Sequence, residues 1–454
     1  MCLTGENRKQ KGRKKMGFLT FKGGIHPDDG KCFSKDQPVQ TILPKGDLVY
    51  PLSQHIGAPA QPLVKKGDHV LKGQMIASAS GFVSAPVHAS VSGTVKGLEQ
   101  RFSPAGTKGE CIVIENDGEY REAEYEPVKP LEEMSRDEIL EKIGESGIVG
   151  MGGAGFPTRV KLSPKEPENI DYIIANCAEC EPYITADYRR MLENTEELIS
   201  GMRVVLSLFP NAKGIFAVED NKKDCIDKLK SAVDDEPRMQ VASLVTKYPQ
   251  GAERQLIYAV TKRAINSSML PADAGCIVDN VETLIGIHRA VIEGKPLTER
   301  IVTVSGDDIA SPGNFKAPLG ISHQELVDAA GGFITQPQKL ISGGPMMGFA
   351  MVTVDAPVTK TSSSLLAFKE DEVAKSQETA CINCARCVDV CPSRLVPSRL
   401  ADLAQRHDED GFVAMNGPEC VECGSCSYVC PAKRQLKQAI GSMRKTALAN
   451  KKKK

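Results

Sequence analysis

Short apolar runs in the middle of the chain predict a sheet of buried strands separated by helices. The runs lie at residues 172–175, 214–218 and 241–245, and strands buried on both faces are typical of parallel sheets. Helical patterns of apolar residues cover 189–205 and 253–263. Strands that alternate with helices indicate a mostly parallel α/β sheet.

An earlier region, from about residue 37 to residue 114, has short apolar runs interrupted by Gly and Pro, which predicts β-structure. Its Gly67-Asp68 pair suits a turn. The alternation resembles the barrel-sandwich modules of lipoyl and biotinyl proteins, which carry a prosthetic group on a lysine at a hairpin tip. The corresponding tip, residues 78–82, contains no lysine. We therefore expect a docking or structural module.

Charge and polarity mark the boundaries between regions. Charged residues 119–133 are predicted to form a linker, and Ser/Thr-rich residues 359–364 are predicted to form a hinge. A small β-rich unit at about 300–352 precedes this hinge, and a cysteine-rich helical module at about 375–440 follows it. The chain therefore has several domains.

The composition excludes some classes of protein. With 454 residues, 41% of them hydrophobic, the chain has ample material for packed cores. Lys and Arg total 57 against 58 Asp and Glu, a net charge of -1, so we expect no nucleic-acid partner of the polyelectrolyte type. No stretch reaches the roughly 18 apolar residues that a membrane-spanning helix needs.

Both ends of the chain are basic. Residues 1–16 carry six basic side chains with no apolar segment after them, so we expect a basic leader rather than a secretory signal, with Met16 as an alternative start. After Glu422 no acidic residue occurs, while nine are basic. This tail is predicted either to be solvated or to lie near anionic lipid.

Fifteen cysteines without an export signal favour metal ligands over disulfides. Eight of them form a repeat in which C-x2-C-x2-C-x3-C-P occurs twice, starting at Cys381 and at Cys420. In this pattern three cysteines wrap one cubic cluster and the fourth ligates the other cluster. One [4Fe–4S] cluster is therefore assigned to Cys381, Cys384, Cys387 and Cys430, and a second to Cys420, Cys423, Cys426 and Cys391.

Two zinc sites with four cysteines each are the alternative, although zinc ribbons use paired C-x2-C knuckles and need neither a third cysteine nor a Cys-Pro pair. Most of the other seven cysteines are predicted to be small buried side chains. Cys177 and Cys180 have the spacing of a redox pair.

A glycine-rich segment, residues 150–158, contains G-x-G-x-x-G. Ser135 and Glu138 form a capping box that begins a helix before it, so the strand that a Rossmann fingerprint requires is missing. Either the glycines let the backbone approach a flat or phosphorylated ligand, with Lys161 near a phosphate, or they form a tight turn between helices.

Three polar loops accompany this segment. Residues 176–182 and 248–253 follow predicted strands, and residues 279–283 open a helix. Ligands of open α/β sheets bind beyond the carboxyl ends of the strands. The combination predicts a site for a polar aromatic cofactor.

These segments resemble the flavin- and NADH-binding subunit of respiratory complex I and, over roughly residues 17–440, the RnfC subunit of Rnf complexes, which are ion-translocating ferredoxin:NAD⁺ oxidoreductases. The resemblance implies a multidomain α/β protein. The implied parts are a basic leader and N-terminal segment (1–36), a barrel-sandwich module (37–125), an FMN/NADH-binding α/β domain (135–295), a ligand-binding β-grasp unit (296–355), a ferredoxin domain with two [4Fe–4S] clusters (370–440) and a basic tail (441–454).

The resemblance also implies site residues. Those implied around the flavin are Gly150, Gly152, Gly153, Gly155, Lys161, Asn176, Glu179, Glu181, Asp279, Asn280 and Thr283, with Gly251 and the catalytic Glu253 beside the nicotinamide. The chain departs from the complex I pattern at Met151, Ala252, Cys177 and Cys180.

The implied function is an NAD-linked oxidoreductase that works as part of a translocase. FMN would exchange hydride with NAD(H) and single electrons with the clusters, because a flavin is stable in one- and two-electron forms. The implied partners are the other subunits of an Rnf-type complex, and ferredoxin through them, at the cytoplasmic face of a bacterial or archaeal membrane. The alternatives are a soluble reductase such as a cobalamin reductase, and a non-enzymatic iron–sulfur relay or scaffold.

Overall fold

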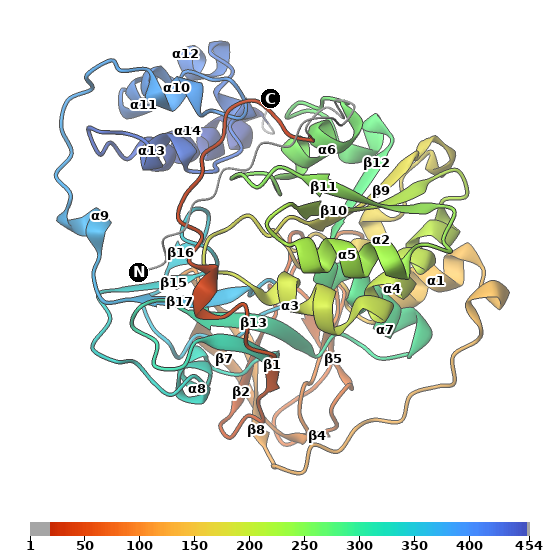
Figure 1. The fold of residues 1–454 in the computed structure, drawn as a ribbon. Helices are drawn as coiled ribbons and strands as arrows, with labels where there is room; N and C mark the ends of the chain where they lie inside the picture. The colour runs from red at the N-terminus through yellow and green to blue at the C-terminus, as the bar shows by residue number, and fades with distance from the viewer. Residues whose placement is uncertain (1–18, 452–454) are drawn as a thin grey trace.

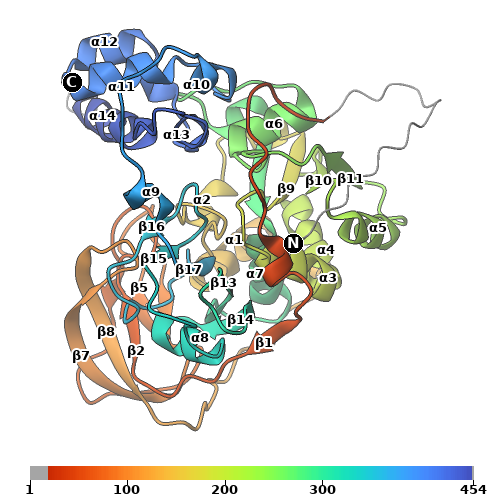
Figure 2. The same cartoon turned by 60° about the vertical axis from the view of Figure 1, so that its left-hand side comes forward.

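A computed structural model describes residues 19–451 of the chain. The leader expected at residues 1–16, with Met16 and Cys2, lies outside the described residues. Figures 1 and 2 show two β modules below, an α/β domain to one side of them, and a small helical module above. The order of parts along the chain agrees with the predicted fold class.

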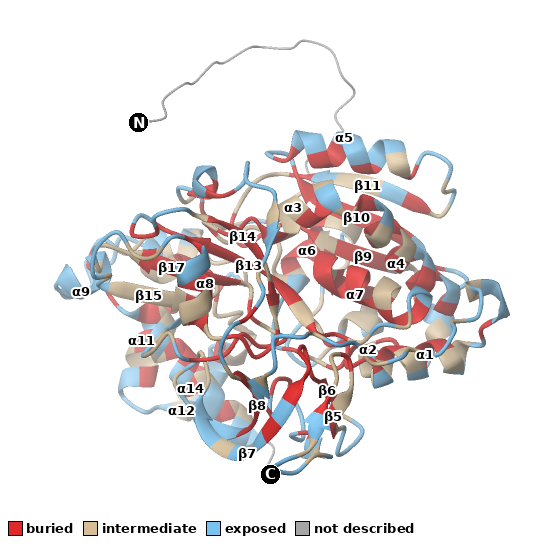
Figure 3. Ribbon diagram, turned by 90° about the horizontal axis from the view of Figure 1, so that it is seen from below, coloured by how far each residue is buried: buried red, intermediate tan, exposed pale blue. Residues whose placement is uncertain are grey.

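The α/β domain contains a four-stranded parallel sheet in the order β11-β10-β9-β12. The strands are β9 (Tyr172–Cys177), β10 (Lys213–Glu219), β11 (Met239–Leu244) and β12 (Cys276–Asn280). Strand β10 is buried from its second residue onward, as a strand covered on both faces must be. The predicted parallel sheet is therefore confirmed, and Figure 3 shows the buried residues along β9 and β10.

Helices cover both faces of this sheet. The helices of the domain are α1 (Arg136–Glu145), α2 (Thr158–Lys161), α3 (Ala186–Glu193), α4 (Thr195–Leu208), α5 (Lys223–Ala232), α6 (Glu253–Thr261) and α7 (Val281–Ile292), with short 3-10 turns at Leu131–Glu133, Pro167–Asn169 and Pro271–Ala274. The capping box at Ser135 and Glu138 is present at the start of α1. The helical pattern over 189–205 is confirmed, and it is divided between two helices, because the backbone at Asn194 leaves helical geometry between α3 and α4.

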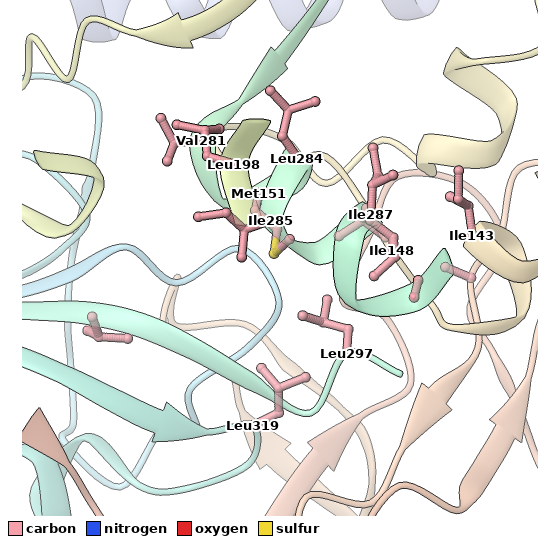
Figure 4. Close-up of a cluster of buried hydrophobic side chains, with 14 of the residues drawn as sticks. Ile143, Ile148, Met151, Leu198, Val281, Leu284, Ile285, Ile287, Leu297 and Leu319 are labelled. Carbon is pink, nitrogen blue, oxygen red and sulfur yellow. The ribbon is translucent and has the colours of Figure 1, made fainter. Parts of the chain in front are cut away.

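Helix α7 is apolar on nearly all sides because it lies at the centre of the domain (Figure 4). Its residues Val281, Leu284 and Ile287 are fully buried. A Cβ on Gly201 of α4 would lie 2.0 Å from the Leu284 carbonyl oxygen, so only glycine lets the two helices approach this closely. This packing fixes the amino end of α7, which borders the predicted site.

The N-terminal β module consists of two small antiparallel sheets. One contains β2 (Leu48–Pro51), β8 (Lys108–Asn116), β7 (Gly93–Phe102) and β4 (His69–Val70), and the other β3 (Gln61–Pro62), β5 (Met75–Ser78) and β6 (Val87–His88). The hairpin tip that lacks a lysine instead exposes Phe82.

The second β module is a six-stranded mixed sheet with helix α8 (His323–Ala329). In order its strands are β1 (Val39–Thr41), β14 (Gly313–Pro318), β13 (Glu299–Ser305), β17 (Ser364–Phe368), β15 (Lys339–Ser342) and β16 (Phe349–Ala350). The hinge predicted at 359–364 is wrong. Thr359, Lys360 and Ser362 are buried, and the chain continues directly into the interior strand β17.

The C-terminal module contains five short or medium helices after a connecting segment with α9 (Glu372–Lys375). They are α10 (Arg386–Asp389), α11 (Pro397–Gln405), α12 (Glu409–Ala414), α13 (Ser425–Tyr428) and α14 (Leu436–Lys451), with a 3-10 turn at Gly417–Glu419. A further 3-10 turn, Lys31–Phe33, lies near the N-terminus and outside this module. The prediction that a basic tail begins at residue 441 is wrong for residues 441–451. These residues belong to helix α14, whose Met443 and Ala447 are buried in the module. Within residues 19–451, no helix is long and apolar enough to cross a lipid bilayer.

Candidate functional site

The polar loops singled out in the sequence meet at one edge of the parallel sheet. Asn176 at the end of β9 and Asn280 at the end of β12 are register partners on neighbouring strands. The side-chain amide of Asn176 donates to the Gly251 carbonyl at 2.8 Å, which joins the loop after β11 to the same edge. The carboxyl ends of three strands thus form one surface, where open α/β sheets bind ligands.

The glycine-rich segment covers this edge. Its Met151 N–H donates to the hydroxyl oxygen of the fully buried Thr283 at 3.0 Å, which ties the loop to helix α7. A Cβ on Gly152 would lie 2.7 Å from the Asn280 Cβ, whereas a Cβ on Gly153 would meet no atom within 4 Å. The loop is therefore tight on its protein side and open on the other, as a cradle for a flat group requires.

Lys161 closes one end of the edge. Its Nζ donates to the Val278 carbonyl at 2.7 Å and lies 3.1 Å from Asp279 Oδ1. Although burial opposes its charge, Asp279 and Glu253 raise the pKa of Lys161. The ammonium group is held as a cation beside the glycine loop.

Unpartnered buried atoms test whether a polar cofactor fits here. Asp279 Oδ2 and Gln250 Nε2 are buried without a hydrogen-bond partner among the described residues. Such atoms are costly unless something satisfies them. Together with the open side of Gly153 and the Lys161 cation, they fit a group with a flat ring system and a phosphate. Glu253, the first residue of α6, is exposed at the rim.

The loop after β9 is fixed by contacts with Lys31 and with the start of helix α3. Glu179 is almost fully buried, and its Oε1 accepts the Asp187 N–H at 2.7 Å, with Lys31 Nζ 3.8 Å from Oε2. Lys31 also donates to the carbonyls of Glu181 and Ile184. Burial raises the pKa of Glu179 and, despite that carboxylate, lowers the pKa of Lys31. Glu179 therefore supports the loop rather than facing its open side.

Sequence reasoning missed two charged groups beneath the site. The Asp187 carboxylate accepts the Asn280 side-chain amide at 2.6 Å, and burial together with Glu179 and Glu282 raises the pKa of Asp187 to about 7. Arg300, from β13 of the mixed sheet, is buried and donates to the Met151 carbonyl at 3.2 Å. Asp187 and Arg300 are linked to the site through their hydrogen bonds to Asn280 and Met151. Because both partners are distant in sequence, no local pattern indicates either residue.

The four cysteines of the second set, Cys420, Cys423, Cys426 and Cys391, lie close together: the last cysteine of the first run meets the loop of residues 420–426. Cys391, Cys420 and Cys426 lie against one apolar cluster of the helical module, as do Cys387 and Cys430 of the first set, and Cys423 is buried. Burial raises the pKa of the Cys426 thiol to about 12, and the thiols of the other three members of the set add to this shift. Backbone N–H groups of Leu395 and Glu422 donate to two of the sulfurs at 3.3 Å. Such N–H···S bonds suit a cluster-binding loop.

The first cysteine set lies at the surface. Cys381 and Cys384 are exposed, and Cys387 and Cys430 are half-buried. The Thr379 N–H donates to the Ala432 carbonyl at 3.0 Å, which brings the start of the first run beside the end of the second. The contact agrees with crossed assignment of Cys430.

The two cysteine runs share a backbone conformation. Positive φ occurs at Asn383 and Glu422, at Ala385 and Gly424, and at Arg394 and Lys433, which are equivalent positions of the repeat. Positive φ is uncommon away from glycine, so its recurrence shows that both runs fold into the same loop. In the described part of the chain, no three His, Cys, Asp or Glu side chains are arranged to hold a single metal ion.

The remaining described cysteines are mostly interior. Cys111, Cys177, Cys225 and Cys276 are buried, as expected, and Cys32 is exposed. Cys177 and Cys180 belong to different packed clusters, and the Cys180 sulfur accepts the Gly251 N–H at 3.4 Å. They do not form the redox pair that their spacing allowed.

A cavity of about 260 Å³ lies between the N-terminal β module and helix α7, and Met151 of the glycine-rich segment and Glu282 of α7 contribute to its lining. Its charged lining is paired internally, with Lys72 bound to Glu122 and Arg190 to Glu282. It offers no unmatched charge to a ligand.

Comparisons with known families cover most of the chain. Residues 143–289 match the Nuo51 FMN-binding domain, residues 19–119 the RnfC barrel sandwich hybrid domain, residues 301–350 the SLBB domain, and residues 374–432 a 4Fe-4S dicluster domain.

Individual proteins are similar over long stretches. The RnfC-type component of a proton-translocating ferredoxin:NAD(+) oxidoreductase complex from Clostridium ljungdahlii is 45% identical over 85% of this chain and 85% of its own length. The equivalent component of an Na(+)-translocating ferredoxin:NAD(+) oxidoreductase complex from Acetobacterium woodii is 43% identical over 96% of this chain and 98% of its own length. A crystal structure of an NAD+-reducing [NiFe]-hydrogenase in the H2-reduced state has a TM-score of 0.49 and 19% identity, covering 71% of this chain and 62% of that one.

Proposed function

Because the chain belongs to the RnfC family, whose members are components of ion-translocating ferredoxin:NAD(+) oxidoreductase complexes, as its motifs predicted, we propose that it exchanges hydride between NAD(H) and FMN and single electrons between FMN and two [4Fe–4S] clusters. When bound, the flavin supplies the conversion between two-electron and one-electron transfer. The protein supplies position, charge and exclusion of water.

Contact between the two candidate sites carries this proposal. The loop after β11, which borders the glycine cradle, also reaches the cysteine loops, because the Tyr248 hydroxyl donates to the Cys423 carbonyl at 2.7 Å. Tyr248, Ile25 and Cys423 form one buried cluster, with Cys180 packed against it. An electron carrier in the cradle would therefore adjoin the second cysteine set.

The residues have separate roles in this scheme. Gly152 and Gly153 admit the ring system, Lys161 neutralises the phosphate, and Asn176 and Asn280 hold the polar edge. Glu253 at the exposed rim orients the nicotinamide. The set with the buried Cys423 and the half-buried Cys391, Cys420 and Cys426 takes the inner cluster, and the set with the exposed Cys381 and Cys384 takes the outer one.

The outer cluster would then exchange electrons with a partner, since Cys381 and Cys384 face solvent. We propose that the partners are the other subunits of the complex, with ferredoxin reached through them, and that the chain lies at the cytoplasmic face of the membrane. A soluble reductase has the same cofactors but no membrane partners, and copurification with hydrophobic subunits from detergent extracts separates the two.

The test is cofactor analysis of the purified chain followed by titration with NADH. We expect one FMN and about eight irons per chain, bleaching of both chromophores by NADH, and spin-resonance signals from two clusters. Iron without acid-releasable flavin would instead indicate a relay or scaffold. Failure to find about eight irons would contradict the cluster assignment.

A further inference from the structure

One tyrosine joins both loops that carry the inner cysteine set to the cofactor edge of the α/β domain. Tyr248 follows β11 and is almost fully buried. Its hydroxyl lies 2.7 Å from the Cys423 carbonyl oxygen and 3.3 Å from Glu181 Oε1. A phenol has a single proton, which serves the nearer acceptor, the Cys423 carbonyl oxygen.

The backbone of Tyr248 makes the second connection. Its N–H and carbonyl pair with the carbonyl and N–H of Ile25 at 2.9 and 2.8 Å. The residue before Ile25, Gly24, donates its N–H to the Val390 carbonyl at 2.8 Å, next to the cluster ligand Cys391. The first part of residues 19–33, the N-terminal strap, thus runs between the α/β domain and the helical module, and its end at Lys31 lies against the loop after β9 (Figure 2).

Glu181 links this tyrosine to the loop of the mixed sheet. Its Oε2 accepts the Met346 N–H at 3.1 Å, and the Met346 carbonyl accepts Lys437 Nζ from α14 at 3.2 Å. Burial raises the pKa of Glu181. The α/β domain, the mixed-sheet loop at Met346 and the helical module therefore meet at Tyr248 and Glu181.

The other contacts described between the two parts lie near the surface. Residues 372–386 are exposed throughout, so the covalent link does not fix the helical module. Outside the Tyr248 cluster, Glu419 pairs with Arg254 at 2.8 Å and accepts the Ser267 N–H at 2.8 Å. The ion pair is partly solvent-exposed, and such pairs contribute about 1 kcal/mol or less. Interfaces of this kind permit relative motion of domains.

We propose that Tyr248 is a positioning residue whose hydroxyl holds the inner cluster loop against the flavin edge and so sets the rate of electron transfer between them. This inference rests on the proposed function and deepens it. The described hydrogen bonds of the Tyr248 side chain go to Cys423 and Glu181, and to neither Glu253 nor an outer cysteine. The effect of Tyr248 is therefore confined to the step between flavin and inner cluster.

The test is Tyr248→Phe in the cofactor-loaded protein, with Tyr428→Phe as the matched control. Tyr428 lies between the ligands Cys426 and Cys430 but is exposed, and its hydroxyl has no hydrogen-bond partner among the described residues. For Tyr248→Phe we expect NADH to bleach the flavin as fast as in the unmodified protein. Reduction of the clusters should be slower by about fivefold, the effect of one lost hydrogen bond of about 1 kcal/mol.

Spin resonance gives a readout independent of turnover. The midpoint potential of one cluster should become more negative in Tyr248→Phe, because a donor to its ligand loop is gone, while the other cluster and both signals of Tyr428→Phe stay unchanged. Unchanged cluster reduction and potentials in Tyr248→Phe would overturn the inference. Missing flavin or iron in the unmodified protein would instead refute the proposed function.

Hydrogen exchange tests the inference if the Tyr248→Phe variant binds less iron than the unmodified protein, because amide exchange is measured without a signal from the clusters. Comparison of the as-purified proteins should then show faster amide exchange confined to residues 420–426 and 344–348. Faster exchange throughout the α/β domain would mean that Tyr248 is only a core residue, and would overturn the inference.

Discussion

Lys161 Nζ lies 3.1 Å from Asp279 Oδ1, which joins the end of helix α2 to strand β12. The Asp279 side chain is fully buried, whereas Lys161 keeps about a quarter of its side chain exposed. One Asp279 oxygen remains without a partner in the described residues. The pair holds a cation at the edge while leaving a polar atom for a ligand.

We expect Lys161→Met to weaken FMN binding by about 10- to 100-fold, because a charged hydrogen bond contributes about 1.5–3 kcal/mol. Fluorescence titration of the flavin-free protein measures this. Lys165→Met, which removes an exposed lysine four residues away, should bind FMN normally. Equal affinity of both variants would remove Lys161 from the site.

Gly152 and Gly153 offer a matched pair. Gly152→Ala places a Cβ 2.7 Å from Asn280 Cβ, so we expect a loss of about 1–3 kcal/mol in the free energy of unfolding. Gly153→Ala meets nothing in the protein and should unfold like the unmodified chain, yet bind FMN at least about tenfold more weakly. Normal FMN affinity of Gly153→Ala would show that the loop does not touch the flavin.

Crossed ligation makes a prediction about which cysteines act together. Cys391→Ala should abolish the same spin-resonance signal as Cys423→Ala, and Cys430→Ala the same signal as Cys384→Ala. Iron should fall from about eight to about four per chain in each. The buried Cys111→Ala serves as the control and should keep both signals. Loss of one and the same signal in Cys391→Ala and Cys384→Ala would refute the crossing.

Lys360 makes stability depend on pH. Its Nζ is fully buried, donates to the carbonyls of Pro86 and Gly147, and has its pKa lowered to about 7 by desolvation. The unfolded chain, with the ordinary value of 10.5, binds more protons than the folded chain between these two values. Stability from this group therefore rises with pH from about 7 to 10 by about 1 kcal/mol per pH unit, and is lowest below pH 7.

Lys360→Met should remove that dependence. Melting temperatures of both proteins measured at pH 6, 7, 8 and 9 give the comparison. We expect the melting temperature of the unmodified protein to rise relative to that of the variant only above pH 7. Parallel curves over the whole range would show that Lys360 has the same pKa in the folded and unfolded chains, and so stays charged when buried.

Local signals in the sequence were enough for much of the fold. The apolar runs predicted β9 and β10, whose residues are mostly buried, and also the edge strand β11, although its Gln240 and Ser243 are exposed. The Ser135 capping box predicted the start of α1. Where neighbours distant in sequence decide the outcome, the predictions were wrong. Ser/Thr-rich residues 359–364 had the composition of a hinge but are buried between Gln54, Gly147 and β17.

The sequence by itself determined the chemistry: eight cysteines at cluster spacing, and glycine and polar loops at strand ends, because ligand type and backbone freedom are properties of single residues and short spacings. Tertiary structure decided which of these groups meet. Only the folded chain brings Lys31 beneath Glu179 and Tyr248 against Cys423, over 148 and 175 residues of sequence. No local pattern encodes such contacts, because they result from the packing of whole domains against one another.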